Sequence, residues 1–339
     1  DEDATKALLD MLDNHQPSIV GAAAEALGNF TGLEQKERKK LFEELLKSLM
    51  SARGKVDADP SDNIAREWWN VVSAPLMTAM TALSLANLSN GRFILGLGVS
   101  GPQVVEGLQG VSYKGPLGRL KENVEIIKMA FRGEKVVYDG RHFTLPLPGG
   151  EGKSLRLDHP PRDIPIFLAT LGPKSLEYTG AIADGWLGTS FSPDHPEAHI
   201  DYLKMGAEKA GRSLADLELH SSCNVAIGEN VQEMIDAHKP GVAFSMGAMG
   251  SEKTNFYNDA FKRAGYTDDA LAIQRLWKAG KRQEAIDRVP DAMVTKFSAI
   301  GTEDMVRKRF EIYRDAAVSY THLRAHETSL HLVCRLLLE

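Results

Sequence analysis

Six residues with the spacing of a nucleotide-binding turn form the most conspicuous chemical signal of the sequence. The segment GLGVSG, residues 96–101, follows an apolar run and fits the pattern G-x-G-x-x-G. In a Rossmann fold such glycines let a pyrophosphate lie against the backbone at the start of a helix. Here Pro102 follows directly, and no second strand ending in an acid arrives to hold a ribose. The glycines predict either a strand end that a ligand approaches closely or one packed against a neighbouring strand.

A second turn of small residues has the composition of a phosphate-binding loop. Residues 169–186 read ATLGPKSLEYTGAIADGW, in which Gly172 and Pro173 open a predicted helix. Proline suits the first turn of a helix, and the free N–H groups of that turn attract anions. Lys174 adds a positive charge. A tight turn without a ligand accounts for the same residues equally well, so both interpretations stand.

Two histidines and two cysteines offer weaker chemistry. His195 and His199 have a helix-like spacing, but no cysteine or acidic pattern accompanies them, so a solvated helix start is the better interpretation than a metal site. Cys223 and Cys334 lie far apart in sequence and match neither a disulfide framework nor a zinc motif. We expect no metal, and a reducing cytoplasm fits.

The composition is that of a soluble globular protein. The 339 residues are 43% hydrophobic and 25% charged, with a net charge of -6. Basic residues are mixed with acids and form no stripe, so we expect no nucleic-acid partner. No apolar run approaches the length of a membrane span, and we expect no membrane partner.

Strand and helix patterns alternate through the middle of the chain. Four apolar segments read as strands, at residues 92–98, 164–170, 185–190 and 217–228. Between them lie helical stripes, one of which consists of Leu120, Val124, Ile127 and Phe131. This alternation predicts parallel βα units of an α/β fold. The Pro- and Gly-rich residues 145–163 form a long connection, which in a compact domain is usually a functional loop or lid.

Several separated motifs resemble one enzyme family. The segments LSNGRFILGLGVSGPQVVEG, YDGRHFTLPLPGGEGK, LATLGPKSLEYTGAIADGW and GAMGSEKTNFYN, in this order over residues 74–318, are similar to the luciferase-like monooxygenase superfamily in its deazaflavin-dependent branch. The resemblance implies a TIM barrel and hydride transfer between coenzyme F420 and a small organic substrate. It also implies a homodimer. An FMN-dependent monooxygenase of the same superfamily is the alternative, because fold alone does not choose the cofactor.

The resemblance assigns cofactor contacts by position. The family's loop after its fourth strand matches Gly98, Val99, Ser100 and Gly101, and its phosphate-holding loop after the fifth strand matches Ala169, Thr170, Leu171, Gly172 and Pro173. Gly188 and Thr189, after the next strand, are weaker matches. Relatives often keep a glutamate in the first loop as proton donor; here that place reads Gly101-Pro102-Gln103, and an exposed helix face is the favoured interpretation of Glu106. The catalytic residues therefore stay unassigned.

The resemblance begins near the fourth strand, so we predict a partial barrel of about strands 4 to 7 and feeble or absent turnover. Residues 1–73 resemble a HEAT-type helix pair, which would favour a protein-interaction scaffold as a third function; a generic amphipathic helical hairpin accounts for the same pattern equally well. Residues 319–339 resemble the translated adapter read-through of metagenomic assemblies. We expect three segments, a HEAT-like segment at 1–73, the enzyme at 74–318 and a non-native tail, joined as an accidental fusion; a genuine two-domain protein is the less favoured alternative.

Overall fold

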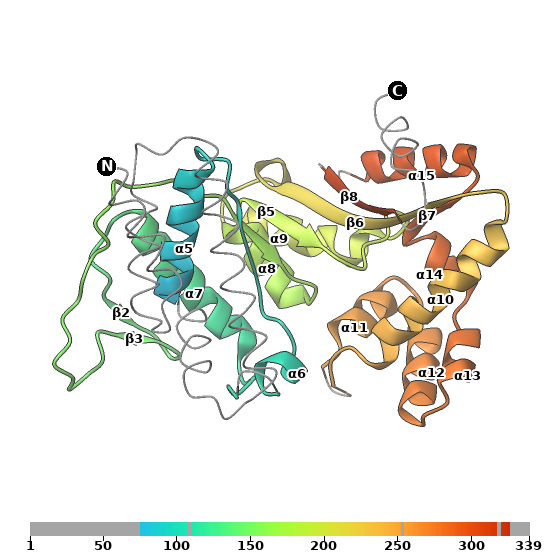
Figure 1. The fold of residues 1–339 in the computed structure, drawn as a ribbon, viewed down its shortest axis with the longest axis horizontal. Helices are drawn as coiled ribbons and strands as arrows, with labels where there is room; N and C mark the ends of the chain where they lie inside the picture. The colour runs from blue at the N-terminus through green and yellow to red at the C-terminus, as the bar shows by residue number, and fades with distance from the viewer. Residues whose placement is uncertain (1–74, 108–109, 252–253, 317–319, 326–339) are drawn as a thin grey trace, which may run out of the picture. The chain divides into compact units, whose positions relative to one another are not determined.

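The computed structural model describes residues 75–107, 110–251, 254–316 and 320–325. They divide into two compact units (Figure 1). One unit runs up to residue 165 without residues 96–98, and the other consists of residues 96–98 and the chain from 166 onward. The HEAT-like segment predicted at 1–73 lies outside the described residues.

The described part of the first unit, from residue 75 onward, contains three helices and a hairpin: α5 (Pro75–Leu88), α6 (Pro102–Val105), α7 (Pro116–Phe131), β2 (Tyr138–Asp139) and β3 (Thr144–Leu145). Helix α7 carries the predicted apolar stripe. The four residues of this stripe are buried: Leu120, Val124, Ile127 and Phe131. Its stripe therefore packs inward, as the periodicity predicted.

A buried carboxylate fastens the hairpin region to α7. Glu122 accepts hydrogen bonds from the backbone N–H groups of Arg141, His142 and Phe143 at 2.9, 2.8 and 2.9 Å. Burial alone would raise the pKa of Glu122, but these three N–H donors lower it below its ordinary value of 4.5. The hairpin is thus held by a charged acceptor.

The second unit is built on a parallel sheet, as predicted from the alternation of strands and helices. Its strands are β1 (Leu95–Gly98), β4 (Ile166–Ala169), β5 (Gly185–Gly188), β6 (Glu218–Ile227), β7 (Ser298–Gly301) and β8 (Tyr320–Ala325). They follow the order β1-β4-β5-β6-β7, and β8 pairs with β6. Parallel pairing is recorded for β4 with β5 and for β6 with β5, β7 and β8. The four predicted strands correspond to β1, β4, β5 and β6, which confirms them.

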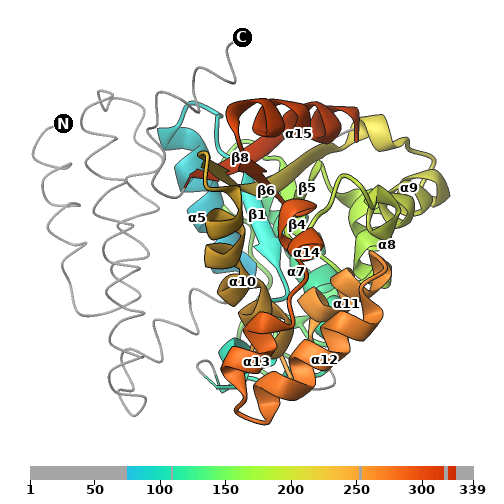
Figure 2. The ribbon, with the colours of Figure 1, turned by 90° about the vertical axis from the view of Figure 1, so that its right-hand side faces the viewer.

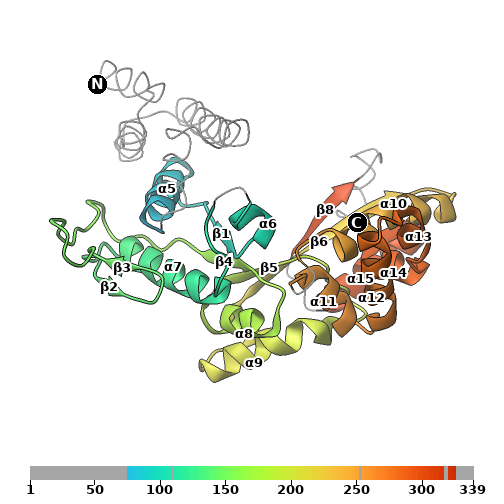
Figure 3. The ribbon, with the colours of Figure 1, turned by 90° about the horizontal axis from the view of Figure 1, so that it is seen from below.

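Helices α8 (Pro173–Ile182), α9 (Ile200–Lys209) and α15 (Glu303–Asp315), with the 3₁₀ turns η1 (Pro196–Ala198) and η2 (Leu214–Asp216), supply the layer beside the sheet. Helices α8 and α9 lie side by side (Figure 3). One apolar cluster joins these helices to the face of β5 and β6 that is turned toward them. Its members include Leu176, Trp186, Leu203, Leu219, Val225, Val306 and Tyr313.

An all-helical insertion separates β6 from β7 and was not predicted from the sequence. It comprises α10 (Val231–Gly247), α11 (Phe256–Arg263), α12 (Thr267–Lys278), α13 (Arg282–Asp287) and α14 (Asp291–Thr295), which cluster together in Figure 2. A second apolar cluster fills it and reaches Ala226 and Ile300 in the sheet. No element was predicted between residue 228 and β7, although α10 (17 residues) is as long as α7 (16 residues).

Strand β8 falls in the segment that the sequence assigned to a foreign tail. Residues 320–325 pair in parallel register with residues 220–225 of β6. The sheet therefore continues past residue 318, and six positions of the predicted non-native tail form a strand of it. The foreign origin of residues 319–339 stays a prediction. None of the described helices is long and apolar enough to cross a membrane.

Candidate active site

The face of the sheet opposite α8 and α9 carries Ala169 at the end of β4, Leu187 near the end of β5, and His220 beside Leu187 on β6. Strand register pairs Phe167 with Gly185 and Leu187 with His220. Since side chains alternate between the two faces of a strand, Ala169, Leu187 and His220 belong to one face, and Trp186 and Leu219 to the buried face. The exposed Ala169 ends β4 on this open face.

Gly98, at the end of β1, lies directly beside Ala169. A Cβ atom at Gly98 would stand 3.2 Å from the carbonyl oxygen of Ala169 and 3.3 Å from its Cβ. Both residues are exposed. Because Gly98 has no side chain and Ala169 has only a methyl group, the backbone of the two strand ends is accessible here. A planar ring can approach such a surface closely. The structure thus brings together two of the sequence-predicted site residues from separate motifs.

The loop between β4 and α8 has its carbonyl groups tied back to the protein. Trp186 Nε1 donates to the carbonyl of Thr170 at 2.9 Å, and Arg263 Nη2 donates to that of Leu171 at 2.6 Å. The carbonyl of Gly172 accepts from Ser175 Oγ at 2.8 Å and from two backbone N–H groups of the first turn of α8. Three successive carbonyls are therefore occupied by protein donors.

The N–H groups of the same peptides consequently point the other way. In a trans peptide the N–H of one residue is antiparallel to the carbonyl of the residue before it, so the anchored carbonyls of Thr170 and Leu171 direct the N–H groups of Leu171 and Gly172 outward. Neither N–H group has an acceptor among the residues that the structure describes. Together with the N-terminus of α8, these groups form the kind of cradle that binds phosphate.

Helix α11 of the insertion reaches this loop. Its first residue, Phe256, comes within 3.9 Å of a Cβ built at Gly172, and its last residue, Arg263, donates to Leu171 and, at 3.1 Å, to Ala198. Helix α11 of the insertion therefore packs against one side of the loop between β4 and α8.

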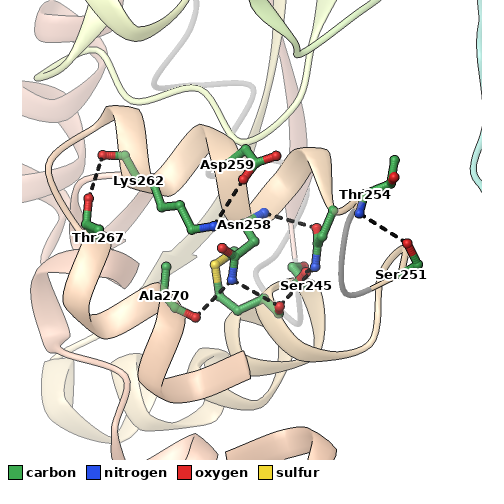
Figure 4. Close-up of polar contacts among 10 residues, drawn as sticks. Ser245, Ser251, Thr254, Asn258, Asp259, Lys262, Thr267 and Ala270 are labelled. Atoms are coloured by element: carbon green, nitrogen blue, oxygen red, sulfur yellow. Dashed lines mark hydrogen bonds and ion pairs between the residues drawn. The ribbon is translucent and has the colours of Figure 1, made fainter. Parts of the chain in front are cut away.

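A buried amide network fixes the start of α11 (Figure 4). Asn255 accepts from the backbone N–H of Asn258 at 3.0 Å and donates to the carbonyls of Ser245 and Met246. Asn258 Nδ2 donates to Met246 at 3.2 Å and to Ala270 at 2.9 Å, which joins α10, α11 and α12. Both side chains are buried, so these bonds are formed away from water.

Two further predicted residues follow β5, and they have different surroundings. Gly188 is buried on the helix side, where a Cβ would lie 2.5 Å from the Trp186 ring. The lack of a side chain at Gly188 makes room for that tryptophan, and the contact of Gly188 with the cofactor stays a prediction. Thr189, the next residue, is exposed. Pro173 stands in the first turn of α8, after Gly172 as N-cap, as predicted.

The remaining residues of the first predicted loop belong to the first unit. Val99 and Gly101 are half-buried, and Ser100 has a left-handed backbone, φ 54°. The hydroxyl of Tyr113 donates to the carbonyl of Ser100 at 2.9 Å. Glu106 accepts from the backbone N–H of Tyr113 at 2.9 Å, so its carboxylate closes this loop. That Val99, Ser100 and Gly101 contact the cofactor stays a prediction.

His199 is not the solvated residue that its sequence context indicated. Its side chain is buried between the rings of Trp186 and Phe191, at centroid distances of 5.5 and 6.0 Å. Burial, with a smaller contribution from the positive charge of Arg263, lowers its pKa to about 3, so the ring is neutral. Neither ring nitrogen has a hydrogen-bond partner among the described residues. The prediction failed because helical spacing does not reveal which side of a short turn faces the core.

Sequence reasoning missed His220. Its ring packs edge-on against Phe167, with centroids 4.9 Å apart, and its Nε2 lies 3.2 Å from a carboxylate oxygen of Glu218. It shares the open face with Ala169. Alternation along β6 was the available signal, because His220 is out of phase with the buried Leu219, Ser221 and Cys223. An imidazole on this face can donate or accept a proton.

Comparison with known proteins identifies the family of this chain. The family model for luciferase-like monooxygenases matches residues 70–320. A protein of Mycobacterium tuberculosis named as a coenzyme F420-dependent oxidoreductase is 39% identical over 254 residues, which cover 72% of this chain and 73% of that protein. The 5,10-methylenetetrahydromethanopterin reductase of Archaeoglobus fulgidus is 28% identical over 251 residues, or 73% and 71% of the two chains.

A solved structure supports the same assignment. The coenzyme F420-dependent tetrahydromethanopterin reductase of Methanopyrus kandleri superposes with a TM-score of 0.60 at 25% identity, covering 75% of this chain and 74% of that one. This likeness confirms the predicted fold, a part of a TIM barrel. With half of the chain and more matched by one family model, the chain belongs to the luciferase-like monooxygenase family.

Proposed function

We propose that this chain is an oxidoreductase that transfers hydride between coenzyme F420 and a small organic substrate. Relatives at 39% and 28% identity carry names that specify this cofactor or a reductase activity. The family itself includes enzymes of more than one cofactor, so the assignment depends on the named relatives together with the candidate site.

The observation that carries the proposal is the β4–α8 loop with its carbonyls held by Trp186, Arg263 and Ser175. It leaves two outward N–H groups at a helix N-terminus, which suits the phosphate of a phosphate-bearing cofactor. The exposed backbone at Gly98 and Ala169 suits the flat ring system of the same molecule. The residues therefore fit the group that the relatives' names imply.

When bound, a deazaflavin supplies the hydride chemistry, and the protein orients it and excludes water. In this chain, Gly98 and Ala169 would face the ring, and Leu171 and Gly172 would hold the phosphate through their backbone N–H groups. If the substrate is reduced at a polar double bond, one proton must be added besides the hydride. The imidazole of His220, which lies on the same face of the sheet as Ala169, is the candidate group that holds this proton.

Equilibrium titration with oxidised coenzyme F420 and with FMN tests the proposal. We expect a fluorescence change that saturates with F420 and weaker or absent binding of FMN. Tight FMN binding without F420 binding would reverse the assignment and favour the FMN-dependent monooxygenase. Turnover is a separate measurement, and the expectation of feeble activity would be refuted by cofactor-dependent catalysis at ordinary enzyme rates.

Three further properties belong to this proposal. We propose a cytoplasmic location, a homodimer, and a lid role for residues 145–163. Sedimentation analysis of the purified chain tests the second, and proteolysis within residues 145–163 with and without cofactor tests the third, because a lid becomes protected when it closes.

A further inference from the structure

Arg263 links the helical insertion to the loop that holds the phosphate in the proposed function. It is the last residue of α11, and its guanidinium donates to two carbonyls that belong to different segments, Leu171 at 2.6 Å and Ala198 at 3.1 Å. The 2.6 Å contact joins residues 92 positions apart. An arginine can make both bonds at once because its donors form a rigid planar fork.

The bond to Leu171 has a specific geometric consequence. The carbonyl of Leu171 and the N–H of Gly172 belong to one planar peptide, so holding the first sets the direction of the second. Trp186 does the same for the peptide between Thr170 and Leu171. The peptide that follows has no N–H, because residue 173 is proline. Arg263 therefore controls one of the two outward N–H groups of the loop.

We propose that Arg263 is a positioning residue of the phosphate seat, which holds the Leu171–Gly172 peptide so that the Gly172 N–H faces a bound phosphate. This inference rests on the proposed function for its ligand, but it holds for any phosphate-bearing tricyclic cofactor. Arg263 is half-buried, and its positive charge acts on the buried His199, whose ring is neutral. The insertion thus contributes to binding through a main-chain group of another element.

The chain offers a matched control. Arg212 is also half-buried, and it also donates to main-chain carbonyls near α8, those of Gly180 at 3.3 Å and Ala183 at 2.9 Å. These carbonyls lie at the far end of the helix from Gly172. Arg212 also donates to the carbonyl of Asp216 at 3.3 Å, so Arg212→Gln removes three main-chain bonds without touching the loop and reports how much such a loss affects folding.

The experiment compares ligands that differ only in the phosphate-bearing side chain. Coenzyme F420 is paired with its phosphate-free deazaflavin chromophore, and FMN is paired with riboflavin. The dissociation constant of each is measured by fluorescence titration for the full chain and for Arg263→Gln, Arg263→Lys and Arg212→Gln. We expect Arg263→Gln to reduce the preference for the phosphate-bearing member about tenfold and Arg212→Gln to leave it unchanged.

Arg263→Lys separates geometry from charge, because lysine keeps the charge but lacks the planar fork whose separate nitrogens reach the two carbonyls. We expect it to lose the preference nearly as far as Arg263→Gln. Full recovery with lysine, or an equal loss of affinity for both members of a pair, would overturn the positioning role. If only the flavin pair binds, the proposed function fails while the role of Arg263 is still measured. A chain that binds neither pair, or that shows no preference for the phosphate-bearing member, contradicts the inference.

Discussion

At the scale of single residues, the candidate site consists mainly of groups whose side chains are small or absent. Gly98 and Ala169 expose backbone at two neighbouring strand ends, and the loop after β4 presents N–H groups. Such a surface gains its specificity from shape and from main-chain direction. A bulky side chain is therefore the most informative perturbation.

Gly98→Leu should abolish the approach of a planar ring to the open face. The Cβ of the new side chain would stand 3.2 Å from the carbonyl oxygen of Ala169 and 3.3 Å from its Cβ, so the two strand ends must shift slightly, and thermal unfolding is measured beside binding. We expect the dissociation constant of the cofactor to rise at least about tenfold, which corresponds to roughly 1.4 kcal/mol. Gly241→Leu, at a position with nothing within 4 Å of the added Cβ, is the control, and unchanged binding in Gly98→Leu would exclude this surface.

Glu122 makes a prediction about acid stability. Its pKa is lower in the folded than in the unfolded chain, so its contribution is fully present above the unfolded value, near 4.5, and is lost as pH falls through the folded value. Glu122→Gln should lower the free energy of unfolding by about 1–3 kcal/mol at neutral pH. Its stability should also change less with acidification below pH 4.5. Parallel pH profiles of wild type and variant, monitored by thermal unfolding, would disprove the assignment.

At the scale of elements, the insertion between β6 and β7 is more than a covering for the sheet end. The amide network of Asn255 and Asn258 joins three of its helices, and α11 then presents Phe256 and Arg263 to the β4–α8 loop. Damage to the network should therefore affect both stability and binding.

Asn258→Ala removes the donor to two buried carbonyls, those of Met246 and Ala270. Each loses its bond to Asn258 in the core, so we expect about 1–3 kcal/mol of destabilisation. Asn258→Asp should be worse, because it places a carboxylate against the same two carbonyls. Thermal unfolding measures both variants, and Thr267→Ala, which loses only an exposed 3.4 Å bond to Lys262, serves as the control. Equal stability of all three would contradict a structural role of the network.

At the scale of the whole molecule, the division of the sequence into separate segments stays a proposal. The change of pattern near residue 74 indicates a boundary between two folding units. Limited proteolysis should then yield a resistant fragment that begins near that residue, identified by mass spectrometry. One resistant unit spanning residues 1–318 would count against an accidental fusion and favour a genuine two-domain protein.

The sequence by itself determined the parallel α/β fold, the four strands around which it is built, and the family. The fold and its strands follow from hydrophobic periodicity, and the family follows from the sequence motifs and their order along the chain. Tertiary structure decided which residues meet. The missing side chain of Gly188 leaves room for the Trp186 ring, and His199 is buried. Arg263 donates a hydrogen bond to the carbonyl of Leu171, which lies about 90 residues away in the sequence. Spacing along a chain cannot encode these contacts, because each depends on which face an element turns to the core and on how a distant helix packs against it.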